Sequence, residues 1–254
     1  MPDDQADLGI LFALNFELKE FVRALRRRGC HIECWEGVFK SRLGETMVLA
    51  LSSGVGWERA RASARFLVDK GVEAVLAAGI AGGLDPKLAR GDLIIAKRVY
   101  SDVSAQCSPI ECDLLLSDMT NMAGHGAEHA VRLADIISCK SVICLPEEKA
   151  RLYVATGAAA VDMESYAVAQ VCRATGIRFS AVRVVSDTAS DILPGIFADG
   201  GLSKSAFLWG LGKRPTELPS LLGFYFIAQR SARKLATFLV DVLIKVSQEG
   251  RDRL

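Results

Sequence analysis

Short apolar runs alternate along this chain with longer segments of helical periodicity, and this alternation constrains the fold more than any other feature. The strand-like runs are residues 8–14 (LGILFAL), 45–54, 73–83, 91–102, 158–165 and 177–187. The helical segments are residues 17–29, 57–71 and 165–176, and each ends in a glycine. Strands that alternate with helices of this length predict a mostly parallel sheet covered on both faces.

The predicted fold class is therefore α/β: a single-domain, three-layer α/β/α fold with a mostly parallel mixed central sheet and a C-terminal helical tail. No repeat, linker or low-complexity segment divides the 254 residues, so residues 1–254 are read as one domain. Residues 8–191 form the expected core, and residues 192–254 form a helical extension.

The tail contains an apolar stretch, residues 221–228 (LLGFYFIA), that is much shorter than the ~20 residues of a membrane span. Two interpretations stay open for it. The tail could be a helix packed on the domain or on a partner subunit. It could also present an apolar surface for a lipid-like ligand or for peripheral contact with a membrane.

Charge and cysteine content exclude several classes of function. The chain carries 31 basic and 30 acidic side chains, a net charge of +1, which gives no electrostatic case for binding nucleic acid. The first residues, MPDDQADLGI, are acidic where a signal peptide would be basic. Seven scattered cysteines form no CxxC pair, which favours reduced thiols and a cytoplasmic location over a disulfide framework.

A glycine-rich turn, SSGVGWERA, follows the second strand and opens a helix, which invites a dinucleotide-binding interpretation. Gly54 and Gly56 match the motif G-x-G-x-x-G, but Arg59 stands in place of the third glycine. We therefore expect no nicotinamide or flavin cofactor. The glycines would still let backbone N–H groups approach a ligand.

Residues 125–129 (HGAEH) match the H-x-x-E-H pattern of one group of zinc peptidases. Gly124 and Gly126 each weaken a helix there by about 1 kcal/mol relative to alanine, and no third ligand stands at a suitable spacing. Ordinary surface histidines are the better interpretation, so no metal site is predicted.

Carboxylates stand at the carboxyl ends of two predicted strands, where open α/β sheets bind ligands. In AVDMES, Asp162 and Glu164 flank Met163, and in VRVVSD an apolar strand ends in Ser186 and Asp187. One acid at such a junction can cap the following helix, which is worth up to ~1 kcal/mol. A cap explains one acid of the first pair, but not both.

In this order, these segments resemble the nucleoside phosphorylase and nucleosidase superfamily that includes methylthioadenosine/S-adenosylhomocysteine nucleosidases. The resemblance rests on Glu17 after the first strand, SSGVG, AGIAGGLDP with GDLIIA after it, VDMES and VRVVSD, and it spans residues 8 to about 191. Residues 191–229 resemble the hopanoid-associated phosphorylases, a branch implied to remove adenine from adenosylhopane.

The resemblance implies chemistry at a purine–ribose bond. Asp187 would be the general acid that protonates N7 of the leaving purine, supported by Ser186 and Arg183. Glu17 matches the carboxylate that activates the attacking water in nucleosidases. Such proton transfers are typically worth about 10²–10⁴-fold in rate.

The resemblance also implies the substrate-binding residues. Glu164 would bind the ribose hydroxyls, Met163 would pack against the sugar, and Gly79, Ile80 and Ala81 would line the sugar and nucleophile site. Asp162 has no implied role beyond a structural partner.

Two departures from the family bear on the nucleophile. Ile80 stands where relatives carry a serine, and Ala77–Ala78 replace an arginine of some bacterial purine phosphorylases. Phosphate as a co-substrate and hydrolysis by water both stay open. The expected adenine loop, near residues 145–157, is shorter than its nucleosidase counterpart.

Three alternatives to adenosylhopane cleavage follow. They are a methylthioadenosine/S-adenosylhomocysteine nucleosidase, a general purine nucleoside phosphorylase, and a non-catalytic nucleoside-binding protein. The resemblance further implies a homodimer or a higher homo-oligomer.

Overall fold

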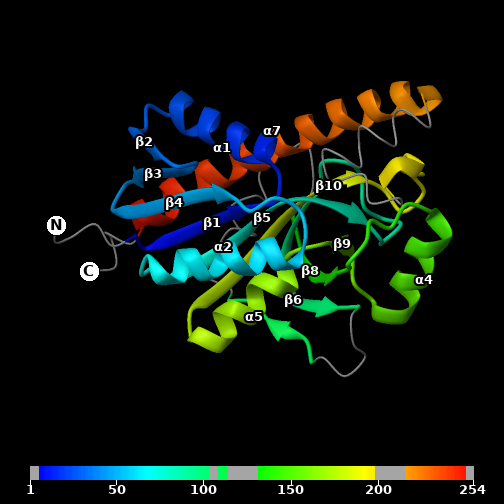
Figure 1. Cartoon of the computed structure of the whole chain (residues 1–254), viewed down its shortest axis with the longest axis horizontal. Coiled ribbons are helices and arrows are strands. Elements are labelled where there is room, and N and C mark those ends of the chain that lie inside the picture. The colour runs from blue at the N-terminus through cyan, green and yellow to red at the C-terminus, as the bar shows by residue number, and fades with distance from the viewer. Residues whose placement is uncertain (1–5, 103–107, 114–130, 198–214, 250–254) are drawn as a thin grey trace.

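The computed structural model describes residues 6–102, 108–113, 131–197 and 215–249, in which a ten-stranded sheet lies between two layers of helices (Figure 1). The strands are β1 (Leu8–Phe12), β2 (Ile32–Trp35), β3 (Val38–Leu43), β4 (Thr46–Ser52), β5 (Ala74–Gly83), β6 (Leu93–Ser101), β7 (Ile110–Glu111), β8 (Val131–Ser138), β9 (Ala160–Asp162) and β10 (Arg178–Asp187). The helices are α1 (Asn15–Arg27), α2 (Trp57–Asp69), α4 (Pro146–Thr156), α5 (Ser165–Thr175) and α7 (Leu218–Glu249), with 3₁₀ turns at Gly195–Phe197 and Pro215–Glu217.

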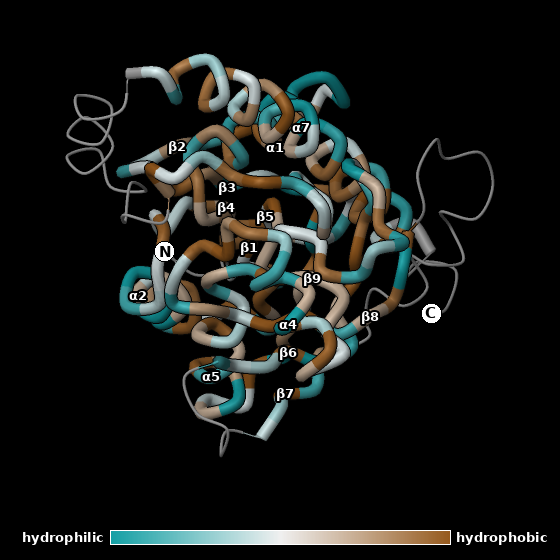
Figure 2. The backbone as a smooth tube through the Cα atoms, turned by 90° about the vertical axis from the view of Figure 1, so that its right-hand side faces the viewer, coloured by the Kyte–Doolittle hydropathy of each residue, from teal (hydrophilic) through white to brown (hydrophobic). Residues whose placement is uncertain are grey.

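The sheet is mixed, with parallel strands at its centre. Strand β1 pairs in parallel with β4 and β5, and β5 pairs in parallel with β10. Antiparallel pairs join β10 to β6 and β5 to β9, while β6, β8 and β9 run parallel. These pairings close a ring of strands, β5–β10–β6–β8–β9, and leave β4, β3 and β2 as an open wing. Hydrophobic residues concentrate along the central strands (Figure 2), as expected for strands covered on both faces.

Helices cover both faces, so the predicted three-layer α/β/α fold is confirmed. Helices α1 and α7 lie side by side on one face and share an apolar cluster with the sheet that includes Phe21 and Leu239. Helices α2 and α5 cover the other face, where Leu67 packs against the Cα of Gly9 on β1.

The tail folds back onto the domain as α7. Its second half buries Leu235, Leu239, Val240 and Leu243 against α1 and the sheet. Within the described residues, no helix combines the length and apolar character that crossing a membrane requires.

Four features lie where the sequence pattern predicts no regular structure. They are the β2–β3 hairpin, the short strand β7, strand β8 and helix α4. The hairpin edge strand is mostly exposed, and α4 buries only Lys149, so neither shows the apolar period that identifies an element in sequence.

Replacing Leu239 with alanine should lower the free energy of unfolding by about 2–5 kcal/mol, because the truncated side chain leaves a cavity between α7 and the sheet. Urea unfolding followed by circular dichroism measures this loss. Thr237→Ala, on the exposed side of the same helix, is the control and should change stability by about 0.5 kcal/mol or less. A comparably small loss for Leu239→Ala would show that α7 is not part of the cooperative core.

Candidate active site

A cavity of about 130 Å³ opens where the parallel strands β1, β5 and β10 end. This is the edge of an α/β sheet at which ligands bind. The residues that line it are Ala13, Leu14, Glu17, Val55, Ile80, Ala81, Gly82, Ser141, Val142, Ile143, Val161, Asp162, Met163, Glu164, Ser186, Asp187, Leu193, Phe197 and Phe224.

The three carboxylates that the resemblance assigns to function meet in this cavity. Glu17 comes from α1, Glu164 from the β9–α5 junction, and Asp187 from the end of β10. The implied lining residues Met163, Ile80, Ala81 and Ser186 lie in the same wall. The fold therefore gathers acids from three distant parts of the chain around one space.

Glu17 is held by two backbone donors from different elements. Its Oε2 accepts a hydrogen bond from Leu14 N–H (2.8 Å), and its Oε1 accepts one from Ile80 N–H (2.8 Å). Burial raises the pKa of Glu17, while these bonds and the nearby Arg183 act in the opposite direction. A fixed carboxyl with a raised pKa is suited to accept a proton near neutral pH.

Glu164 is positioned by the glycine turn that precedes α2. Its Oε1 accepts a hydrogen bond from the N–H of Gly56 (2.9 Å), whose φ of +106° favours glycine. Burial, with the neighbouring charge of Asp162, raises the pKa of Glu164 to about 7. The turn that resembles a dinucleotide motif thus orients an acid at the cavity.

Asp162 is the structural member of the AVDMES pair. It accepts hydrogen bonds from the hydroxyls of Ser138 and Ser165 and from Ser165 N–H (3.3 Å), the first backbone donor of α5. It also forms a buried ion pair with Arg183 (2.6 Å). These contacts account for Asp162 and leave Glu164 available to a ligand.

Arg183 and Gly79 lie behind the cavity wall. The resemblance implies that Arg183 supports Asp187, but in the structure its partners are Asp162 and the hydroxyl of Ser165 (2.8 Å). A Cβ at Gly79 would lie 2.6 Å from Arg183 Nη1 and 2.9 Å from Glu17 Oε1. Only glycine lets the arginine and Glu17 approach the strand this closely.

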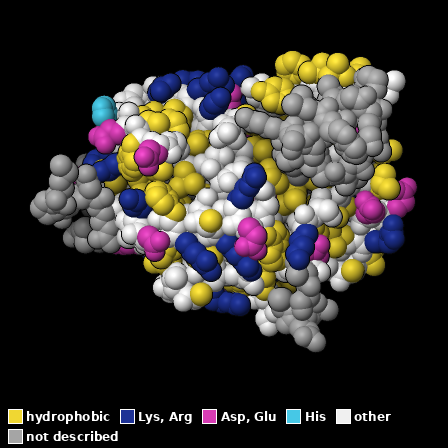
Figure 3. Space-filling view, viewed as in Figure 1, with side chains coloured by type: hydrophobic (Ala, Val, Ile, Leu, Met, Phe, Trp, Pro, Cys, Tyr) yellow, Lys and Arg dark blue, Asp and Glu magenta, His cyan; other side chains and the backbone are white. Residues whose placement is uncertain are grey.

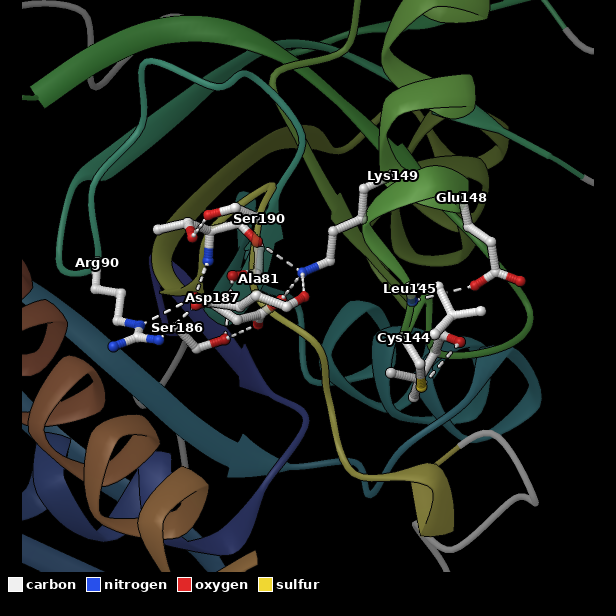
Figure 4. Close-up of polar contacts among 12 residues, drawn as sticks. Ala81, Arg90, Cys144, Leu145, Glu148, Lys149, Ser186, Asp187 and Ser190 are labelled. Atoms are coloured by element: carbon white, nitrogen blue, oxygen red, sulfur yellow. Dashed lines mark hydrogen bonds and ion pairs between the residues drawn. The ribbon is translucent and has the colours of Figure 1, made fainter. Parts of the chain in front are cut away.

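Asp187 has two side-chain partners, and sequence reasoning identified only one. Ser186 Oγ donates to its Oδ1 (2.7 Å), as implied, and Lys149 Nζ donates to its Oδ2 (2.6 Å) (Figure 4). Burial raises the pKa of Asp187, whereas the Lys149 ammonium acts to lower it. No pattern around Lys149 separates it from an ordinary surface lysine in the first turn of a helix.

One end of the cavity is apolar. Phe197 and Phe224 meet edge-on with ring centroids 5.1 Å apart, next to Leu193. The first half of α7 then continues this surface outward, and Figure 3 shows a row of hydrophobic side chains over it. The large hydrophobic residues exposed on that half are Leu218, Leu222, Tyr225 and Phe226.

Metal and thiol chemistry find no support among the described residues. Within them, no group of three or more His, Cys, Asp or Glu side chains could hold a metal ion, and residues 125–129 lie outside the described ranges. Burial raises the pKa of Cys112 and of Cys172 to about 12, the opposite of a reactive thiolate.

The chain is similar to curated nucleosidases across most of its length. A 5′-methylthioadenosine/S-adenosylhomocysteine nucleosidase of Pseudoalteromonas translucida is 26% identical over 210 residues, which cover 76% of this chain and 89% of the relative. The enzyme of the same name from Staphylococcus aureus is 28% identical over 202 residues, covering 72% and 87%.

Solved structures share the fold. Futalosine hydrolase of Helicobacter pylori superposes with a TM-score of 0.73 at 20% identity and covers 95% of this chain and 98% of its own. S-adenosylhomocysteine nucleosidase of Streptococcus pyogenes, in complex with 5-methylthiotubericidin, gives 0.72 at 21% identity, with 96% and 99% covered. A sequence model of the phosphorylase superfamily matches residues 7–207. Because that match spans most of the chain and the fold agrees with it, this protein belongs to the phosphorylase superfamily.

Proposed function

We propose that this protein is an enzyme that cleaves the N-glycosidic bond of a 5′-substituted adenosine and releases adenine. The observation that carries the proposal is the meeting of Glu17, Glu164 and Asp187 in one cavity at the carboxyl edge of the sheet. Curated relatives that cover most of the chain are nucleosidases of methylthioadenosine and S-adenosylhomocysteine, which supports the same reaction class.

Each acid has a separate task in this reaction. Asp187 delivers a proton to N7, so that adenine leaves as a neutral base. As the bond breaks, the sugar gains positive charge, which the surrounding carboxylates stabilise. Ionised Glu164 holds the ribose hydroxyls through charge-assisted hydrogen bonds, and Glu17 takes a proton from the attacking water.

The charge of the cavity favours water over phosphate as the nucleophile. Among the described lining residues, every charged side chain is a carboxylate, namely Glu17, Asp162, Glu164 and Asp187. The two cations behind the wall already face acids, since Arg183 pairs with Asp162 and Lys149 with Asp187. A phosphate dianion would meet repulsion there, and Ile80 offers it no hydroxyl.

The apolar end of the cavity favours a long apolar 5′ substituent. Leu193, Phe197 and Phe224 would cover its first carbons, and the exposed face of α7 would extend the contact beyond the cavity. Burying such a chain is favourable by about 25 cal/mol per Å². Adenosylhopane is the substrate of this kind that the sequence resemblance favours, and methylthioadenosine and S-adenosylhomocysteine are the smaller alternatives.

The exposed apolar face of α7 also suits contact with a lipid surface, from which an apolar substrate would be taken up.

A homo-oligomer, implied by the sequence resemblance, stays a prediction. Because Ile80 replaces a serine and so removes a hydroxyl, a second candidate function is a nucleoside-binding protein without turnover.

Purified enzyme should release adenine from methylthioadenosine, S-adenosylhomocysteine or adenosylhopane at the same rate with and without phosphate. Inosine, tested in the same way, shows whether a general purine nucleoside is also cleaved. Asp187→Asn should lower kcat by about 10²–10⁴-fold, because an amide cannot supply the proton. Chromatography of the released base measures the phosphate dependence and the kcat of the variant. Asp69→Asn, on the exposed end of α2, is the control. Tight nucleoside binding by calorimetry without base release from any substrate would favour the binding-protein alternative.

Glu164→Gln should stabilise the fold while weakening catalysis. Because the pKa of Glu164 is raised from 4.5 to about 7, the unfolded chain loses this proton first, and the folded state loses relative stability between about pH 4.5 and 7. Glutamine removes that cost, so the variant should gain roughly 3 kcal/mol at pH 8 and little near pH 4.5. Its kcat/KM at pH 8 should fall about 10–100-fold as the charged hydrogen bonds are lost.

Urea unfolding near pH 4.5 and at pH 8 measures the change in stability, and adenine release measures the change in kcat/KM. Glu58→Gln, at an exposed acid of α2, should change neither. A stability gain that does not depend on pH would contradict the raised pKa, and unchanged kcat/KM would contradict a role in binding the sugar.

Replacing Leu222 and Phe226 together with serine should separate long-chain from short-chain substrates. Their side chains stand four residues apart on the exposed face of α7, 50% and 65% exposed, so the fold tolerates the change. Adenine release from 5′-hexadecylthioadenosine in phosphatidylcholine vesicles should fall about tenfold through lost apolar contact, while the rate on methylthioadenosine stays unchanged. If the double variant cleaved 5′-hexadecylthioadenosine as fast as the wild-type enzyme does, the proposal of a lipid-like substrate would be contradicted.

A further inference from the structure

Lys149 is a completely buried cation attached to the acid of the proposed reaction. It lies in the first turn of α4 with an exposure of 0%, and its side chain crosses to the end of β10 (Figure 4). Charged lysines are almost never fully buried without a partner, since removing an ammonium from water is costly. Lys149 is the one fully buried residue of α4, whose apolar side chains Leu152 and Tyr153 are only partly buried against the domain.

The ammonium has one acceptor for each of its three N–H bonds. Asp187 Oδ2 lies at 2.6 Å, the carbonyl of Thr188 at 2.7 Å and the carbonyl of Asp191 at 3.2 Å. If Nζ gives up the proton facing Asp187, its two remaining N–H bonds still serve the carbonyls. Its lone pair then accepts the new Asp187 O–H, so every group keeps a partner in both protonation states.

The ion pair creates a difficulty for Asp187 as a lone acid. A general acid must carry a proton, yet an ammonium at 2.6 Å favours the ionised carboxylate. Among the described residues, the other side chain that donates to Asp187 is Ser186, whose hydroxyl is a much weaker acid than an ammonium, and the Asp191 side chain pairs with Arg90. The charged groups around the pair are Asp191, Arg90, Glu148 on α4, and Asp162 and Glu164 across the cavity.

We propose that Lys149 is the source of the proton that Asp187 passes to the leaving purine, so that the two side chains act as one acid. This rests on the proposed function. Lys149 does not touch the substrate in this scheme and acts through Asp187 as a positioning and proton-supplying residue.

One Nζ–H bond of Lys149 breaks as an O–H bond forms on Asp187, leaving a neutral amine and a neutral acid. The Asp187 O–H then breaks as an N–H bond forms at N7, while the electron pair of the C1′–N9 bond moves into the purine. The attacking water forms a bond from its oxygen to C1′ as one of its O–H bonds breaks and Glu17 takes that proton. After adenine leaves, solvent returns one proton to Lys149, and Glu17 releases its proton to solvent.

The first test compares leaving groups. On methylthioadenosine at alkaline pH, where Asp187 of the variants is ionised, Lys149→Gln and Lys149→Met should lower kcat by about 100-fold or more and change KM by less than about threefold. On 4-nitrophenyl β-D-ribofuranoside, whose leaving group needs no proton, the same variants should keep their rate within about threefold. That retained rate also shows that the variants fold, and Lys97→Met, at an exposed lysine of β6, is the control.

Equal losses on the two substrates would overturn the inference, because a lysine that only holds the structure affects both. A loss of less than about threefold on methylthioadenosine would overturn it as well.

The pH profile on methylthioadenosine gives a second readout. Without Lys149, the pKa of Asp187 rises and the acid must take its proton from solvent, so the variants should recover toward the wild-type kcat as the pH falls below that pKa. Above the pKa of Asp187, their kcat should drop about tenfold per pH unit. A deficit that is the same at every pH would reject the inference alone. An inactive wild-type enzyme on all three adenosine substrates would instead reject the proposed function.

Discussion

The buried ion pair between Arg183 and Asp162 is the interaction on which the rest of the site depends. Arg183 stands on the central strand β10, where the absence of a side chain at Gly79 lets it approach Glu17. Its charge lowers the pKa of both Glu17 and Glu164, against the burial that raises them. Without this cation the acids would repel one another and take up protons. Breaking such a pair by removing one partner typically costs about 3–5 kcal/mol.

The site divides its charges into two units with different tasks. In the proposed reaction, the pair of Arg183 and Asp162 lies toward the sugar, and the pair of Lys149 and Asp187 lies toward the purine. Glu164 lies between them with its pKa raised to about 7, so above neutral pH it carries a charge that a ligand can use. Such an excess of carboxylates destabilises the empty fold, and in the proposed reaction it would favour a sugar that becomes positive.

Much of the fold was predictable from local pattern, because buried strands and amphipathic helices must repeat their apolar residues with a fixed period. The β2–β3 hairpin and α4 were not predicted because they lack this period. Strand β2 lies exposed at the sheet edge, and α4 buries only a lysine. The acids of the site were found through their places at strand ends and through the family resemblance. Lys149 neither follows a predicted strand nor belongs to a segment that carries the resemblance. Arg183 was assigned to Asp187, whereas it pairs with Asp162.

The sequence by itself determined the layers, the strand ends and the residue types at the site, since these follow from periodicity and from the order of the segments. Only the tertiary structure decided which cation meets which acid. Lys149 and Asp187 are 38 residues apart, and their pairing depends on how α4 docks beside β10. Ion pairing falls off within a few ångströms, so it is set by packing between distant segments rather than by any local pattern.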